Sequence, residues 1–354
     1  FMEHERVMQE LAPRVLELAQ HARDTGIGIT IDAEESERLE ISLELFERVY
    51  RDASLDGYEW LGLAVQTYQR RARDVVSFLD GLASDIGRRI PVRLVKGAYW
   101  DTEIKNAQVE GLDSYPVFTR KAYTDVSYLA CARQALAAGD TLYPQFATHH
   151  AHTLASVLRY AGSRRDYEFQ RLHGMGEELY AEVINPEKYA RPCRVYAPVG
   201  SHEDLLPYLV RRLLENGANT SFVNRIVDES IDVQDIVADP ILAAREQDYT
   251  PHPHIKPPAE MFGNERTNSR GINLPDRNVT QQLLADMQRL SGKTHAACPI
   301  IGGERRGDEE VLSTNPANTK EVVGTCKQST LEDVETALSI AVDAQPRWDR
   351  TPAA

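Results

Sequence analysis

Six short apolar segments alternate with helical segments along the first 215 residues, and this alternation limits the fold more than any other feature of the sequence. The predicted strands cover residues 26–32, 61–66, 91–96, 142–148, 167–173 and 193–199. The spacing of apolar residues predicts helices over 2–25, 35–51, 70–86, 151–161, 176–184 and 202–215, with one long helical region that ends near residue 138. Strands joined by helices in this way are typical of a parallel sheet in an α/β protein.

Polar residues end or follow each predicted strand, and they help to choose between two architectures. These residues are Asp32, Gln66, Lys96, Thr148 with His149, His173 and Tyr196. In a (β/α)8 barrel the carboxyl ends of the strands meet on one face, whereas in an open doubly wound sheet they are spread along a line. The sequence therefore favours a TIM-like barrel. Because six strands cannot close it, we expect its first two strands to lie before Phe1.

The rest of the chain has a different pattern. Four prolines between residues 250 and 258 and many Gly, Asn and Arg after them predict a linker over 231–297, with one helix near 279–290. Residues 298–354 return to an ordered pattern, with a strand near 322–323 and a helix from 330. Ser329 and Glu332 predict a capping box at the start of that helix. The predicted domains are 1–230, 231–297 and 298–354.

Composition narrows the range of partners. The net charge of −14 argues against nucleic acid as a partner. The four cysteines are far apart in the sequence, which indicates a reducing compartment without disulfides. No segment is apolar enough to span a bilayer, and the first residues do not form a signal peptide. We therefore expect a cytoplasmic protein.

The segment 92–100 carries the first candidate site. Arg93 lies inside an apolar strand, Lys96 lies at its end, and Gly97 lets a ligand approach the backbone closely. Burying an arginine is costly unless an acceptor is present. Two cations at a strand end suit a phosphate or an electron-rich ring system, but an internal ion pair with a carboxylate such as Asp32 explains Arg93 equally well.

The histidine-rich segment after the fourth predicted strand is the second candidate site. A metal-dependent barrel hydrolase is one hypothesis, with His149, Asp32 and His173 as ligands. The hypothesis is weakened because few other ligands are available at the strand ends. The position of His150 and His152 favours a role at the start of a helix, and a hydrogen bond to a cofactor is a further possibility.

Two adjacent arginines form the third candidate site. Arg211 and Arg212 lie on the polar side of the predicted helix 202–215, where they could hold a small carboxylate with bidentate hydrogen bonds. Periodicity alone favours an exposed pair between Arg211 and Glu215, worth about 0.3 kcal/mol. Asp32 and Tyr196 could bind an amine and cover a small ring, or they could be ordinary polar residues of a barrel rim.

Five segments, in order, strongly resemble the proline dehydrogenases, especially the proline dehydrogenase part of the large bacterial bifunctional proline utilization flavoproteins. They are IDAEE at 31–35, RLVKGAYW at 93–100, YPQFATH at 143–149, LHGMGE at 172–177, and YAPVG at 196–200 with LVRRLLENGANTSFVNR at 209–225. The resemblance covers about residues 1–245. Residues 298–354, with IGG at 301–303 and NPA at 315–317, are similar to the beginning of an aldehyde dehydrogenase.

This resemblance implies a distorted (β/α)8 barrel that holds FAD and oxidises L-proline to Δ1-pyrroline-5-carboxylate, with electrons passed to a quinone. It implies a parent protein that oxidises the product to glutamate with NAD, forms a homo-oligomer and can contact the inner membrane peripherally. An inactive fragment remains the alternative.

The resemblance also assigns roles to individual residues. The implied FAD contacts are Gln66, Arg93, Lys96, Gly97, Ala98, Tyr99, Trp100, Thr119, Thr148, His149 and Glu215. The implied proline contacts are Asp32, Tyr196, Arg211 and Arg212. Arg93, Asp32 and Tyr196 are the implied catalytic residues, with Arg93 beside the reactive flavin nitrogen.

Overall fold

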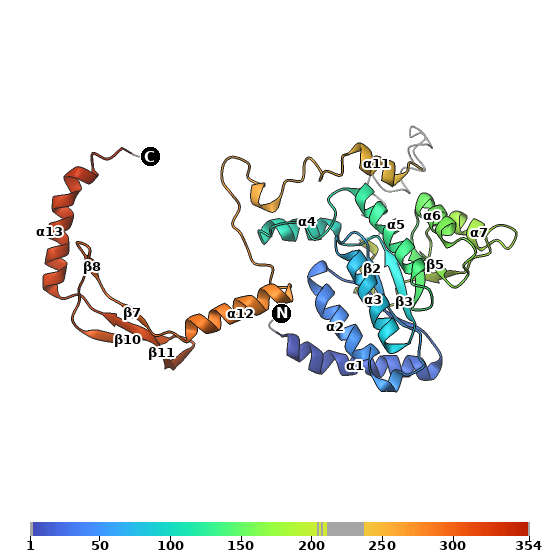
Figure 1. Ribbon diagram of the computed structural model, residues 1–354, viewed down its shortest axis with the longest axis horizontal. Helices are drawn as coiled ribbons and strands as arrows, with labels where there is room; N and C mark the ends of the chain where they lie inside the picture. Colours follow the sequence, from blue (N-terminus) through green and yellow to red (C-terminus); the bar gives the residue numbers. More distant parts are fainter. Residues whose placement is uncertain (1–2, 204, 207, 211–236, 353–354) are drawn as a thin grey trace. The chain divides into compact units, whose positions relative to one another are not determined.

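The structure is a computed structural model that describes residues 3–203, 205–206, 208–210 and 237–352 (Figure 1). The chain divides into two compact units, residues 1–277 and residues 278–354. All candidate site residues belong to the first unit.

A six-stranded parallel sheet forms the centre of the first unit. Its strands are β1 (Ile29–Ile31), β2 (Leu61–Gln66), β3 (Ile90–Val95), β4 (Leu142–Ala147), β5 (Glu168–Leu172) and β6 (Cys193–Tyr196). Each strand pairs with the next one along the chain, so the strand order has no reversal. This order is that of a (β/α)8 barrel and not that of a doubly wound sheet. The predicted fold class is confirmed, as a curled half-barrel whose described strands leave β1 and β6 unpaired with each other.

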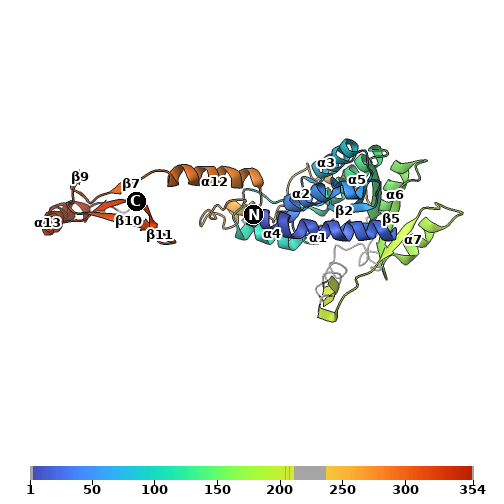
Figure 2. The same cartoon turned by 90° about the horizontal axis from the view of Figure 1, so that it is seen from below.

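Helices pack around this sheet. Those that share the apolar core with the strands are α1 (His4–Thr25), α2 (Leu39–Tyr50), α3 (Ala72–Ile86), α5 (Lys121–Ala137), α6 (Ala151–Ala161) and α7 (Glu177–Ile184). α4 (Trp100–Val109) belongs to a smaller cluster with Tyr68, and α11 (Pro240–Glu246) contacts α5. Figure 1 shows α3 and α5 in front of β2 and β3, and both helices contact the strands. Figure 2 shows α1 running alongside α2, which it also contacts.

The two faces of the strands differ in chemistry. The outward residues are apolar and form the core with the helices: Leu61, Leu63, Val65, Ile90, Val92, Leu94, Leu142, Phe146 and Phe169. Because side chains alternate along a strand, the residues between them face the inside of the half-barrel. Those inward residues include Gln66, Arg93, Gln145, Glu168, Gln170 and Arg194. The strands are therefore fixed by an apolar outer layer, and the inner face is free to carry polar groups.

Two local predictions need correction. The strand predicted over 193–199 ends at Tyr196. The single long helical region is two helices, α4 and α5, because the chain turns at Gly111 with φ +60° and continues through Pro116. Half of the predicted helix 202–215, including Arg211, Arg212 and Glu215, lies outside the described residues, and that half stays a prediction.

The second unit contains two helices, most of α12 (Arg277–Ser291) and all of α13 (Leu331–Trp348). Its three-stranded sheet consists of β7 (His295–Ala297), β10 (Glu310–Asn315) and β11 (Asn318–Lys327). A separate two-stranded sheet consists of β8 (Ile300–Ile301) and β9 (Glu304–Arg305). The capping box of α13 uses Thr330 and Asp333, one residue later than predicted, because Thr330 is the residue with extended backbone before the first helical turn.

The predicted domain boundaries stay predictions, although part of the predicted linker belongs to the first unit. Tyr115 donates a hydrogen bond to the Lys256 carbonyl (2.6 Å), and Asn268 donates one to the Gln108 carbonyl (3.0 Å). Among the described residues, none of the helices is both long enough and apolar enough to cross a membrane.

Candidate active site

Arg93 is the centre of the candidate site. It lies on the inner face of β3, with its side chain largely buried. Its guanidinium forms an ion pair with Asp32, which follows β1, and its Nε donates a hydrogen bond to Gln170 Oε1 on β5 (2.7 Å). The guanidinium carbon also lies 5.4 Å from the centre of the Tyr196 ring at the end of β6. The three predicted catalytic residues, Arg93, Asp32 and Tyr196, are therefore brought together from separate strands.

This arrangement contains the internal ion pair that the sequence alone left open. The two hydrogen bonds use two of the five N–H groups of a guanidinium. Asp32 is the exposed partner, with 71% of its side chain accessible, so a ligand can compete for it. The same contact is therefore compatible with a structural pair and with a ligand-binding arginine held in place.

A second cluster joins the loops that follow β1, β2 and β3. Gln66 is buried at the end of β2, donates to the Glu34 carbonyl (2.6 Å) and accepts from the Ala98 amide (3.2 Å). The Tyr99 hydroxyl donates to the Glu34 carboxylate (2.6 Å). Gln66, Ala98 and Tyr99 are thus held in one place, although Glu34 was not predicted as their partner.

Lys96 lies just after β3 and forms an ion pair with Asp125 on α5. His150, at the start of α6, lies close to this pair. Burial, together with the charge of Lys96, lowers the pKa of His150 to about 3. The imidazole is therefore neutral at physiological pH. His150 caps α6 by accepting from the Thr153 amide (3.3 Å), which confirms its predicted role at the helix start.

Gly97 makes the turn out of β3 possible. Its φ of +143° is one that side-chain-bearing residues rarely adopt, and a Cβ atom there would lie 2.5 Å from the Tyr68 ring. The chain must therefore have glycine here to pass over Tyr68. This reason comes from the fold itself, and it leaves the predicted contact of Gly97 with a ligand as a separate question.

Four further predicted cofactor contacts lie along the same end of the sheet. Trp100 begins α4 and donates to the Phe118 carbonyl (2.8 Å), and Thr119 accepts from the His252 amide (3.1 Å). Thr148 is buried and accepts from the His150 amide (3.2 Å), and His149 Nε2 accepts from the Leu172 amide (3.2 Å). Glu215, Arg211 and Arg212 lie outside the described residues.

The metal hypothesis finds no support in this geometry. Within the described part of the chain, no three His, Cys, Asp or Glu side chains are placed so that they could hold a metal ion. His149 Nε2 already accepts a backbone hydrogen bond from Leu172. Asp32 is paired with Arg93.

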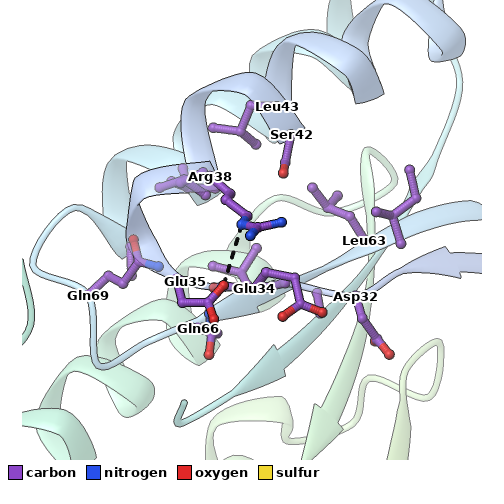
Figure 3. A pocket seen from close by; sticks show the side chains of 16 residues that line it. Asp32, Glu34, Glu35, Arg38, Ser42, Leu43, Leu63, Gln66 and Gln69 are labelled. Atoms are coloured by element: carbon purple, nitrogen blue, oxygen red, sulfur yellow. Dashed lines mark hydrogen bonds and ion pairs between the residues drawn. The ribbon is translucent and has the colours of Figure 1, made fainter. Parts of the chain in front are cut away.

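The pocket in Figure 3 lies beside this site, between the strands β1 and β2 and the helices α2 and α3. It is lined by residues of β1, α2, β2 and α3 such as Leu43, Leu63 and Val75, which belong to the apolar layer under the helices. Arg38 and Glu35 form an ion pair of 3.5 Å at its edge, and Asp32 points away from Arg38 (Figure 3). Asp32 and Gln66 of the candidate site also line this pocket. Because Arg93, Lys96 and Tyr196 do not line it, the pocket is not the candidate substrate site.

The sequence analysis missed a buried polar network below Arg93. Glu168 on β5 is 4% exposed and accepts hydrogen bonds from Arg194 Nε (2.9 Å), Arg194 Nη2 (3.0 Å) and Gln170 Nε2 (2.7 Å). Gln145 adds a further donor (3.1 Å). The signal was available, since residues 168 and 170 are polar at a spacing of two within a predicted buried strand.

The comparison with known proteins decides the family. The family model for proline dehydrogenase matches residues 2–225 of the chain. The chain belongs to the proline dehydrogenase family. This matched range contains every residue of the proposed site, including those outside the described part.

The relatives that the chain matches are much longer than the chain itself. The bifunctional protein PutA of Escherichia coli strain K12 is 48% identical over 364 residues, which cover 99% of this chain and 28% of that protein. A crystal structure of a Bradyrhizobium japonicum PutA mutant has a TM-score of 0.84 at 43% identity and covers 99% of this chain and 32% of its own. The PutA of Bdellovibrio bacteriovorus inactivated by N-propargylglycine has a TM-score of 0.88 at 26% identity, with 98% and 36% covered. The chain therefore spans about a third or less of these relatives.

Proposed function

We propose that this chain forms the site at which a flavoenzyme oxidises L-proline to Δ1-pyrroline-5-carboxylate. The observation that supports the proposal most directly is the convergence of Asp32, Arg93 and Tyr196 from three strands at one end of a proline dehydrogenase half-barrel. In a barrel this end is where active sites are built.

The polar groups at this end fit FAD. Arg93 and Lys96 are cations, and Gln66 is a buried amide beside the turn at Gly97. His150 is neutral and adds no charge. A flavin ring that receives negative charge and an anionic diphosphate both suit such a set of donors. When bound, FAD would supply the two-electron acceptor chemistry that protein side chains lack.

The proposed FAD contacts are the residues that resemble those of the family: Gln66, Arg93, Lys96, Gly97, Ala98, Tyr99, Trp100, Thr119, Thr148, His149 and Glu215. In this proposal Arg93 favours the build-up of negative charge beside it, because its own charge is held in a fixed position by Asp32 and Gln170.

The proposed proline contacts are Asp32, Tyr196, Arg211 and Arg212. Two adjacent arginines can hold the proline carboxylate with bidentate hydrogen bonds, and this fixes the direction of the ring. The Tyr196 ring can cover one face of the pyrrolidine, and Asp32 can attract its amine.

We further propose that electrons leave the flavin for a membrane quinone, and that the protein is a cytoplasmic homo-oligomer with peripheral contact at the inner membrane. The longer relatives are named bifunctional. We propose that the second activity is the NAD-dependent oxidation of the product to glutamate. Residues 298–354 would belong to that aldehyde dehydrogenase part.

The absorption spectrum and metal content of the purified protein, in its longest natural form, test the proposed function. We expect visible flavin bands that disappear when L-proline is added without oxygen. A colourless protein that contains a stoichiometric metal would instead support the hydrolase hypothesis.

Arg212→Ala tests the proposed proline contacts. Because a hydrogen bond to a charged group is worth about 1.5–3 kcal/mol, we expect the KM for proline to rise on the order of 100-fold. Arg165→Ala is a suitable control, since Arg165 is exposed and its hydrogen bonds go to nearby backbone carbonyls. An unchanged KM in the Arg212 variant would remove the carboxylate role.

A further inference from the structure

We infer that Gln170 is a positioning residue that holds Arg93 in place in the site proposed for the flavin, with Glu168 fixing the orientation of the Gln170 amide. This inference rests on the proposed function and extends it to two residues that the family motifs quoted above do not include. Gln170 is 1% exposed and Glu168 is 4% exposed, so water does not compete for their hydrogen bonds.

The Gln170 side chain connects the two groups directly. Its Oε1 accepts from Arg93 Nε at 2.7 Å, and its Nε2 donates to Glu168 Oε1 at 2.7 Å. A carboxylate only accepts hydrogen bonds, and the Arg93 Nε–H only donates. Rotating the Gln170 amide by half a turn would place its N–H groups against the Arg93 Nε–H and its oxygen against the Glu168 carboxylate. The two neighbours therefore permit one orientation, in which the Gln170 oxygen faces Arg93.

Glu168 is itself held firmly. Arg194 binds both of its oxygens, at 2.9 and 3.0 Å, and Gln145 donates to it at 3.1 Å. These donors balance a carboxylate that would otherwise be costly to bury. Glu168 is therefore held in the position in which it accepts the hydrogen bond from Gln170.

The backbone of Gln170 is fixed as well. It pairs with Ala147 on β4 on one side and with Arg194 on β6 on the other. Asp32 at the barrel mouth then holds the other end of the Arg93 guanidinium. Of these two partners, Asp32 is exposed and open to exchange with a ligand, whereas Gln170 is not. Gln170 is thus the partner that can keep Arg93 in place during a reaction cycle.

The chain provides a matched control for this inference. Gln145 is a second buried glutamine, 5% exposed, that also donates to Glu168 Oε1 but has no hydrogen bond to Arg93 among the described contacts. Gln170→Met and Gln145→Met each remove one donor from the same carboxylate. Only the first removes the acceptor of Arg93. A purely structural role predicts the same result for both variants.

The test uses the flavin-loaded protein in its longest natural form and measures the midpoint potential of the flavin, the steady-state constants with proline, and thermal stability. We expect Gln170→Met to make the potential more negative and to lower kcat about tenfold, with KM changed less than about threefold. Gln145→Met should lower the stability similarly, while the potential and kcat stay near the wild-type values. Gln170→Asn keeps the amide group on a side chain that is too short to reach both Arg93 and Glu168. The same measurements are made on this variant if the Met variant fails to fold.

Equal shifts of the potential in the Gln170 and Gln145 variants, or no shift in either, would overturn the inference. The proposed function is tested separately in the wild-type protein. If wild-type protein holds no flavin, or its flavin is not reduced by proline, the proposed function fails before any variant is compared. If the wild type passes, a negative result concerns Gln170 alone.

Discussion

Arg93 shows how a single charged residue can be placed inside an apolar strand. The strand buries Val92 and Leu94 on its outer face, while Arg93 faces inward, where Asp32 and Gln170 accept its hydrogen bonds. Replacing the buried acceptor Gln170 leaves the Arg93 Nε–H without a partner, which costs about 1–3 kcal/mol. Arg93 is therefore tolerated inside the strand because polar groups from distant strands accept its hydrogen bonds.

His150 predicts a pH dependence of stability. Its pKa is lowered by burial and by Lys96 to about 3 in the native state, against about 6.5 when unfolded. Between these values only the unfolded state binds the proton, so stability falls as the pH drops below about 6.5, by about 1.4 kcal/mol per pH unit. His150→Asn retains a helix cap and removes the titration. Denaturant unfolding at pH 7.5 and pH 5.5 should show a smaller loss of stability in the variant.

The control for this experiment is His21→Asn, on the exposed face of α1, which should keep the wild-type pH dependence. If the wild type and the His150 variant lose the same stability between the two pH values, His150 is not the group responsible.

At the scale of elements, the loops after the strands are fixed by buried side chains. Glu103 on α4 is 4% exposed and accepts hydrogen bonds from both the amide (2.6 Å) and the hydroxyl of Ser36, in the segment between β1 and α2. It thereby joins the segment that carries Asp32 and Glu34 to the segment that carries Tyr99. The mouth of the half-barrel depends on this connection.

Glu103→Ala tests that connection. It leaves two donors of Ser36 without a partner, and we expect the free energy of unfolding to fall by about 2–3 kcal/mol. Glu103→Gln should cost less, because the amide oxygen still accepts from the Ser36 backbone. Glu10→Ala removes an exposed ion pair with Arg6 and should change stability by no more than about 0.5 kcal/mol. Similar losses in the Glu103 and Glu10 alanine variants would contradict this account.

The elements could be predicted well where periodicity is strong. The predicted strand 61–66 and helix 151–161 have the observed bounds, because apolar spacing and flanking polar residues mark both ends. The contact of Arg93 with Gln170 could not be predicted, since 77 residues separate them and only the strand register brings them together. The sequence offered Asp32 as one possible ion-pair partner of Arg93, and the structure contains that pair.

At the scale of the whole chain, stability is unevenly distributed. The large apolar core lies within the first unit, between Met8 and Cys193. In the second unit most residues of β10 and β11 are exposed. The two units should therefore open with different free energies.

Hydrogen exchange of residues 1–354 measures this difference. We expect the slowest amide exchange in β2, β3 and β4, most of whose residues are buried, and exchange at least about 100-fold faster in β10 and β11. Equal protection in the two units would show that the chain unfolds as one cooperative body.

The central claim is that proline and a flavin react at the end of the half-barrel where Asp32, Arg93 and Tyr196 meet. An anaerobic titration of the flavin-loaded protein with L-proline, followed by the visible flavin absorbance, tests it most directly. We predict that L-proline bleaches these bands in the wild type and that Arg93→Met slows the bleaching by at least about 100-fold. Flavin bands that persist in excess L-proline, or that bleach equally fast in the Arg93 variant, would contradict the claim.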